Sequence, residues 1–223
     1  MFRRRASFTL LSTSLVFASA QALQSKVSVG KTDADGVPLT GATLCLQSVP
    51  AVCFQMPAAH NGDVTYEFGL DPHAEPLPWR DRKSVVLFDS MFSGGGSGTL
   101  TQYAVLREDP AGPATRLTNV LPYVALTNNS DHAIWNEPEI SPYPLLVTAD
   151  FIWDFDAGES HFSQHRFTIA AWRYNPAKDV YVLALSYKTS KKYDGLDASD
   201  SINVIAPERP EILRRLHSLN QEN

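Results

Sequence analysis

Cysteine is scarce in this sequence, and long apolar runs are confined to its N-terminus. Only two of the 223 residues are cysteines, and their spacing is not the C-x-x-C of redox or zinc motifs. After residue 22 no apolar run approaches the roughly 20 residues that a membrane-spanning helix needs. The sequence also lacks an internal repeat of fixed period and a low-complexity tract, which argues against a repeat architecture.

The sequence lacks a recognisable catalytic motif as well. The glycine-rich run of residues 93–98 precedes a strand-like segment, where a phosphate-binding loop would precede a helix, and it contains no P-loop lysine. No G-x-S-x-G motif surrounds the serine of this run. The run therefore predicts a flexible or tightly curved connection between two strands. A binding loop is the alternative, because the bare backbone of Gly94, Gly95 and Gly96 lets a ligand approach closely.

The first 22 residues have the features of a cleavable signal peptide. Arg3, Arg4 and Arg5 are followed by an apolar stretch of about ten residues and then by small residues with two A-x-A cleavage options, ending at Ala20 or Ala22. We therefore expect an exported protein that is periplasmic or secreted. Removing residues 1–22 leaves 16 basic and 24 acidic residues, a net charge of −8, which argues against binding to nucleic acid or to anionic membrane surfaces.

The two cysteines predict a disulfide. Cys45 and Cys53 are equidistant from Val49, which lies in a Ser-Val-Pro segment that is typical of a turn. A hairpin folded at this turn places the cysteines opposite each other, at a Cα separation that a disulfide can bridge. An oxidising compartment outside the cytosol favours the bond over two free thiols.

Short apolar runs separated by Gly, Pro and Asn predict a mainly β fold. The expected strands are residues 43–46, 52–55, 63–69, 84–92, 99–107, 120–126, 145–155, 162–174 and 180–188. Residues 71–82, residues 108–112 and the polar stretch that ends near Pro144 are expected to be loops. The pattern fits an antiparallel two-sheet sandwich or a meandering, propeller-like stack of sheets, and it does not choose between them. Residues 23–223 are expected to form a single domain.

The C-terminal segment has a helical period. In residues 208–219 one stripe contains Ile212, Leu213, Leu216 and Leu219, with acidic residues in the first turn and basic residues near the end. These charges suit the helix dipole. The sequence therefore predicts one amphipathic helix that packs on the face of a sheet.

Two tryptophans are candidate binding residues. Trp153 and Trp172 lie in predicted strands and are expected in the core, whereas Trp79 and Trp135 lie in predicted loops. Tryptophan in a loop supplies a large, rigid contact surface for recognition. We therefore expect Trp79 and Trp135 to contact a protein or carbohydrate partner outside the cytosol.

The densest group of reactive side chains lies in one short segment. It consists of Asp150, Asp154, Asp156, Glu159, His161 and His165. If the flanking strands pair around a two-residue turn at 157–158, Asp154 faces His161 and Asp150 faces His165, and the four side chains share one face. Such pairs could hold a divalent metal such as zinc, with Asp154, His161 and His165 as ligands. The simpler interpretation is a polar hairpin tip.

Two functional hypotheses remain. The first is an exported, soluble, non-catalytic binding protein without a cofactor, one form of which is an acidic inhibitor of a basic secreted enzyme. The second is a metal- or carboxylate-dependent hydrolase with Asp150, Asp154, Glu159, His161 and His165 as its catalytic groups. The sequence shows no recognisable pair of nucleophile and base, so the first hypothesis is favoured. No motif identifies a protein family.

Overall fold

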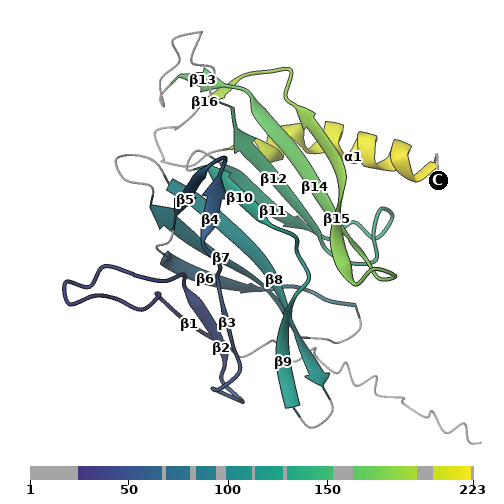
Figure 1. Ribbon diagram of the computed structural model, residues 1–223. Coiled ribbons are helices and arrows are strands. Elements are labelled where there is room, and N and C mark those ends of the chain that lie inside the picture. The colour runs from purple at the N-terminus through teal and green to yellow at the C-terminus, as the bar shows by residue number, and fades with distance from the viewer. Residues whose placement is uncertain are drawn as a thin grey trace, which may run out of the picture.

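The computed structural model of the chain describes residues 25–66, 69–80, 84–93, 99–111, 114–127, 130–152, 163–194 and 203–221. Within these residues the chain is mostly β, in antiparallel sheets, with a single C-terminal helix (Figure 1). The predicted mainly β class with one C-terminal helix is therefore confirmed. The predicted signal peptide, residues 1–22, lies outside the described residues, so export stays a prediction, as does the single domain.

The largest sheet has five strands. They are β6 (Leu70–Pro76), β7 (Val85–Ser93), β8 (Thr99–Ala111), β9 (Ala114–Asn119) and β10 (Val124–Thr127). Their order is β10–β8–β7–β6, and β9 pairs with the C-terminal part of β8. Val85, Val86, Leu87 and Phe88 are all buried, so β7 is covered on both faces, as its continuous apolar run indicates.

The second large sheet has four strands in the order β11–β12–β14–β15. They are β11 (Asp131–Trp135), β12 (Leu145–Phe151), β14 (Phe167–Asn175) and β15 (Val180–Lys188). The last two form the hairpin that the sequence predicts around residues 175–179. The first five residues of β12 are buried without alternation, so this sheet too is covered on both faces.

Three smaller sheets complete the β structure of the described residues. One contains β1 (Ser25–Ser28), β2 (Thr43–Leu46) and β3 (Cys53–Gln55). Cys45 and Cys53 are direct partners in its register and form the predicted disulfide, with an S–S distance of 2.02 Å. The other two are the pairs β4 (Ala59–Asn61) with β5 (Val64–Tyr66) and β13 (Gln164–His165) with β16 (Tyr193–Asp194).

The sheets and the helix stack as layers with a hydrophobic core at each junction. The first core joins Leu44 and Leu46 of the three-stranded sheet to one face of the five-stranded sheet. The second core joins the opposite face, which carries Val105, to Leu146 of the four-stranded sheet. The third core lies between the four-stranded sheet and α1 (Ile205–Gln221), which Figure 1 shows running beside that sheet. Each large sheet is therefore buried between two other layers.

Three segments that the sequence predicts as loops are strands. Residues 71–76 belong to β6, and its prolines are tolerated because β6 is the last strand in the order of its sheet, where no further ladder needs their N–H groups. Residues 108–111 extend β8 and pair with β9. The polar stretch before Pro144 contains β11, a half-buried edge strand. Edge strands are often polar or contain proline, so their apolar pattern is too weak to reveal them.

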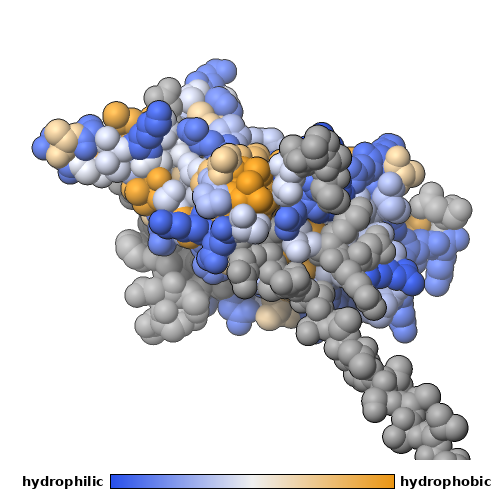
Figure 2. Space-filling view, turned by 90° about the horizontal axis from the view of Figure 1, so that it is seen from below, coloured by the Kyte–Doolittle hydropathy of each residue, from blue (hydrophilic) through white to orange (hydrophobic). Residues whose placement is uncertain are grey.

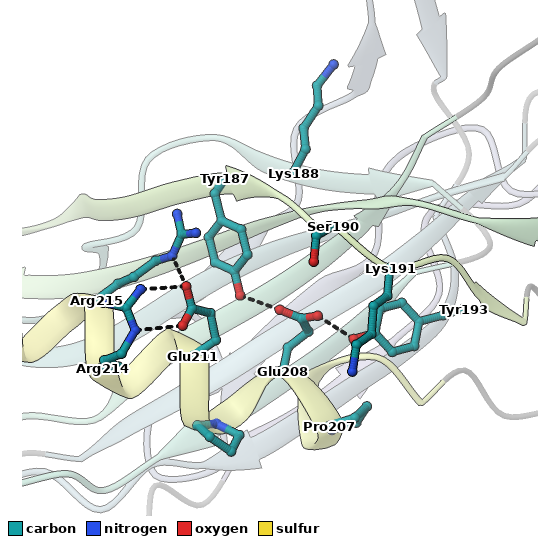
Figure 3. Close-up of a pocket in the computed structure, with 11 residues that line it drawn as sticks. Tyr187, Lys188, Ser190, Lys191, Tyr193, Pro207, Glu208, Glu211, Arg214 and Arg215 are labelled. Atoms are coloured by element: carbon teal, nitrogen blue, oxygen red, sulfur yellow. Dashed lines mark hydrogen bonds and ion pairs between the residues drawn. The ribbon is translucent and has the colours of Figure 1, made fainter.

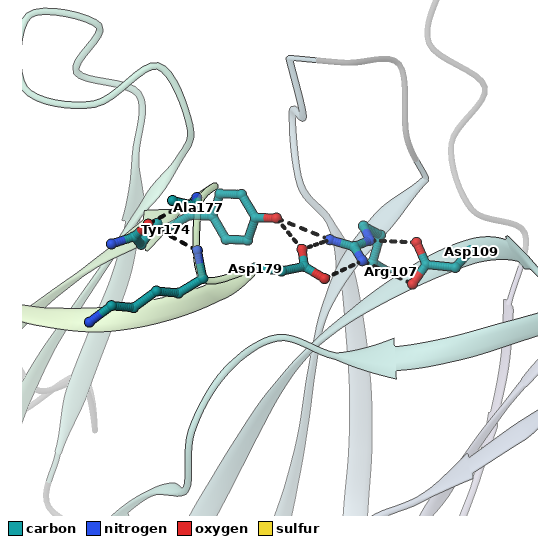
Figure 4. Close-up of polar contacts among 7 residues, drawn as sticks. Arg107, Asp109, Tyr174, Ala177 and Asp179 are labelled. Carbon is teal, nitrogen blue, oxygen red and sulfur yellow. Dashed lines mark hydrogen bonds and ion pairs between the residues drawn. The ribbon is translucent and has the colours of Figure 1, made fainter.

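A buried arginine connects the two large sheets (Figure 4). Arg107 of β8 donates to both carboxylate oxygens of Asp109, at 2.7 and 2.9 Å, and to both of Asp179, which lies in the turn between β14 and β15. The Tyr174 hydroxyl accepts from Arg107 at 3.1 Å and donates to Asp179. Because Arg107 is only 4% exposed, its buried charge depends on these two carboxylates. The contact fixes the β14–β15 hairpin against β8.

The start of α1 is fixed by β11. Oδ2 of Asp131 accepts from the backbone N–H groups of Val204, at 3.2 Å, and of Ile205, at 3.0 Å. These bonds satisfy donors that the start of a helix leaves open.

In the part of the chain that the structure describes, no helix is long and apolar enough to cross a membrane.

Helix α1 docks through part of the predicted stripe, and this makes its packing testable. Ile212 and Leu216 are buried in the third core, whereas Leu219 is 37% exposed. Leu216→Ala should lower the free energy of unfolding by about 2 to 5 kcal/mol, since it removes buried methyl groups and leaves a cavity. Leu219→Ala is the matched control and should cost less than about 1 kcal/mol. Urea unfolding followed by circular dichroism measures both, and equal losses would contradict the docking.

Candidate functional site

A pocket of about 430 Å³ lies where the end of β15 and the connection to β16 meet the first turns of α1 (Figure 3). It is lined by Tyr187, Lys188, Ser190, Lys191, Tyr193, Pro207, Glu208, Pro210, Glu211, Arg214 and Arg215. Most of these side chains are polar, and charges of both signs are present. The volume lies in the range of small-molecule sites, although such sites are usually lined mainly by apolar side chains and this lining is mostly polar.

The strands place the two tyrosines of the pocket toward the helix. Tyr187 and Lys188 are successive residues of β15, so their side chains leave the strand on opposite faces. Figure 3 shows Tyr187 pointing toward α1 and Lys188 pointing away from it. Tyr193 follows in β16, and Lys191 lies on the short connection between the two strands. The Thr189 hydroxyl steadies this connection by donating to the carbonyl of Lys191 at 2.8 Å.

Glu208 is the buried acid of the pocket. It lies in the first turn of α1 and is 8% exposed. Tyr187 donates its hydroxyl to Oε2 at 2.7 Å, and Tyr193 donates to Oε1. Burial, followed by the hydrogen bond to Glu208, raises the pKa of both tyrosines. The hydroxyls therefore stay protonated, and both carboxylate oxygens of Glu208 have a donor from the opposite wall.

Glu211 is the second acid, and it lies between two arginines. Its Oε1 accepts from Arg214 at 2.7 Å and from Arg215 at 2.6 Å, and its Oε2 accepts from Arg214 at 2.7 Å. The hydrogen bonds from Arg214 and then Arg215 lower the pKa of Glu211 to about 2, so it is ionised at neutral pH. The Arg215 guanidinium also lies over the ring of Tyr187, 4.1 Å from its centroid, in a cation–π contact.

The structure separates the two described members of the predicted Asp/His cluster. Asp150 pairs with Thr168 across β12 and β14, so the predicted pairing of Asp150 with His165 is wrong. Phe151 pairs with Phe167 in the same register, and their rings meet edge to face at 5.6 Å in the third core. Burial of these rings sets the register. His165 is buried in β13, which pairs with β16.

Seven of the candidate residues lie outside the described residues: Gly94, Gly95, Gly96, Asp154, Asp156, Glu159 and His161. Among the residues that the structure does describe, no group of three or more His, Cys, Asp or Glu side chains could hold a metal ion. The zinc site of Asp154, His161 and His165 and the hydrolase built on it therefore stay untested predictions.

Trp79 lies in a loop, as predicted, but its ring is only 6% exposed. It packs against Tyr143, Tyr174 and Tyr181, with ring centroids 4.9, 4.8 and 6.2 Å away. The same ring borders a second hollow, of about 540 Å³. Its other lining residues are Pro78, Arg80, Pro138 and Pro142. The contact of Trp79 with a partner stays a prediction.

Trp135 is not in a loop, because it is the last residue of β11. Its ring is partly buried against the third core. The guanidinium of Arg209 in α1 lies 5.2 Å from the ring centroid. Trp135 therefore contacts the helix of its own chain, and its predicted contact with a partner stays untested.

Sequence patterns do not reveal the pocket around Glu208. Three of its residues carry a signal: Tyr187 lies on the alternating face of the strand predicted at 180–188, and Arg214 and Arg215 are among the basic residues near the end of the predicted helix. Neither signal indicates that the strand end and the helix meet. The site arises from packing between segments, which spacing along the chain does not encode.

The buried carboxylate of Asp150 makes a testable contribution to stability. Burial raises the pKa of Asp150 above its ordinary value, although its Oδ1 accepts from the Thr127 N–H and hydroxyl, both at 2.8 Å. A raised pKa means that folding favours the protonated acid, so this contribution to stability is lost as pH rises through the folded pKa. Asp150→Asn keeps the acceptor oxygen without the charge. It should raise the melting temperature at pH 7, and the gain should shrink as pH falls toward about 4.

The control for this prediction is Asp63→Asn, because Asp63 is exposed in a turn. Thermal unfolding at several pH values measures both variants. A loss of stability for Asp150→Asn at pH 7 would contradict the assignment of its carboxylate as a desolvated charge.

Comparison with known proteins finds no relative of this arrangement. No family model matches the chain, no curated protein matches it, and no solved structure matches it. The case for a function therefore depends on the geometry of the described residues.

Proposed function

We propose that the chain is an exported, non-catalytic binding protein whose ligand enters the pocket between α1 and the β15–β16 connection. The observation that carries the proposal is the convergence of polar side chains from two distant segments on one 430 Å³ hollow. The ligand is a small molecule, or a group presented by a protein or carbohydrate partner outside the cytosol. The disulfide Cys45–Cys53 supports that location.

The lining of the pocket favours binding over catalysis. Among the described residues that line it there is no histidine and no cysteine. Histidine and cysteine are the side chains that most often act as base or nucleophile near neutral pH. Its tyrosines have a raised pKa and donate to Glu208. The two hydroxyls and the Glu208 carboxylate are therefore fixed by hydrogen bonds to one another, and groups of this kind orient a ligand without reacting with it.

The surface also favours a pocket over a broad apolar interface. On the face in Figure 2, apolar atoms gather in small patches among hydrophilic ones. The exposed large apolar residues of the described chain lie on three different elements or in the connections between elements: Val29, Val37, Leu39, Val49, Val64, Tyr123, Leu183 and Leu219. Scattered apolar residues of this kind are ordinary on a protein surface and do not mark an interface.

A fragment screen by NMR tests the proposal with a pocket-filling variant. Fragments of neutral, cationic and anionic classes should shift signals of pocket residues such as Tyr187 and Tyr193. Ser190→Trp should abolish these shifts, because Ser190 is an exposed lining residue and an indole there would occupy the hollow. Ser186→Trp is the matched control, since Ser186 is exposed on β15 outside the lining. Shifts scattered over the surface, or equal shifts in both variants, would overturn the proposal.

A further inference from the structure

The charges around the pocket are uneven. Its lining contains four basic and two acidic residues, although the whole chain has a net charge of −5. Lys188 points away from the pocket in Figure 3, so three cations and two carboxylates remain near a ligand. A local excess of positive charge attracts anions even on a protein of net negative charge.

The buried carboxylate does not cancel this excess at the mouth of the pocket. Glu208 is 8% exposed, and each of its oxygens already accepts a tyrosine hydroxyl. Its charge is therefore spread over two hydrogen bonds at the wall. Tyr187 and Tyr193 are only partly buried and are therefore more exposed than this carboxylate.

The two arginines keep donors beyond those that Glu211 uses. Arg214 donates to Glu211 through Nε and Nη2, and Arg215 donates through Nε alone. A guanidinium has five N–H donors in a fixed fork. Toward the described residues, Nη1 of Arg214 and both Nη atoms of Arg215 make no hydrogen bond. The stacking of Arg215 on Tyr187 holds the Arg215 donors at the pocket wall.

Lys191 supplies the cation of the opposite wall. It is exposed on the connection between β15 and β16, and within the described part of the chain it forms no ion pair. Figure 3 shows it beside Tyr193, on the other side of Glu208 from the two arginines. An ammonium group and a guanidinium thus border the hollow from two elements. Such a pair of donors is suited to an oxyanion.

We propose that the pocket binds an oxyanion, a carboxylate or phosphate group of its ligand, between Lys191 and Arg215. This inference rests on the proposed function, because it names the chemical class of the ligand at the same pocket. The Glu211 carboxylate competes with the bound oxyanion for the two arginines, because it accepts their hydrogen bonds and partly neutralises their charge. Neutralising Glu211 should therefore strengthen anion binding, and neutralising Lys191 should weaken it.

Titration calorimetry at low ionic strength, with inorganic phosphate and with succinate as separate probes, tests this inference and distinguishes the two sources of oxyanion. Lys191→Gln should raise Kd about tenfold, the loss typical of a hydrogen bond to a charged group. Glu211→Gln should lower Kd about two- to fivefold, as expected for removal of an exposed competing charge. Lys178→Gln is the matched control and should leave Kd unchanged, because Lys178 is exposed in the β14–β15 turn, outside the lining.

The signs of the two effects decide the outcome. Binding of either probe with opposite changes for the Lys191 and Glu211 variants supports the oxyanion site. Equal affinity in the Lys191→Gln and Lys178→Gln variants overturns it, because the anion then binds elsewhere. If neither probe binds while neutral fragments still shift pocket signals, this inference fails and the proposed function stands. If no fragment of any class binds the pocket, both fail.

Discussion

The contact between Arg107 and the turn that follows β14 is the interaction on which the arrangement of the two large sheets depends. A guanidinium that is 4% exposed loses most of its hydration, and the carboxylates of Asp109 and Asp179 replace it. One carboxylate comes from the same strand, β8, and the other from the turn between β14 and β15 of the opposite sheet. Burial is the main cause, and the hydrogen bond to Asp179 the second, of a rise in the pKa of Tyr174 to about 12. Its hydroxyl therefore stays protonated and can donate. The network thereby fixes where β14 and β15 lie relative to β8.

The candidate site follows from this arrangement. The four-stranded sheet packs by one face on the five-stranded sheet and by the other on α1. Tyr187 lies at the end of β15, the strand that starts beside the Arg107 contact, and it faces the helix. The pocket forms where the strand end and the helix start come together through Glu208 and the two tyrosines. Its geometry is therefore a consequence of the same layers that form the cores.

The sequence reveals the parts of the fold that local patterns determine. The equal spacing of Cys45 and Cys53 about a turn predicts their pairing, and strong alternation predicts β15 at its observed bounds. The sequence does not reveal β6 and β11, because edge strands tolerate proline and polar residues. It gives the wrong register at Asp150, because burial of Phe151 against Phe167 outweighs a possible tight turn. The sequence does not reveal the pocket either, because Lys191 and Arg215 come to line the same hollow only through tertiary packing.

The most direct test of this account is the stability of Arg107→Met in urea, with Arg166→Met as the control, since Arg166 is exposed. We expect Arg107→Met to lower the free energy of unfolding by about 3 to 5 kcal/mol, because it leaves the carboxylates of Asp109 and Asp179 without their buried partner. Arg166→Met should change it by less than about 0.5 kcal/mol. A loss below about 1 kcal/mol for Arg107→Met would contradict the claim that this contact holds the two large sheets together.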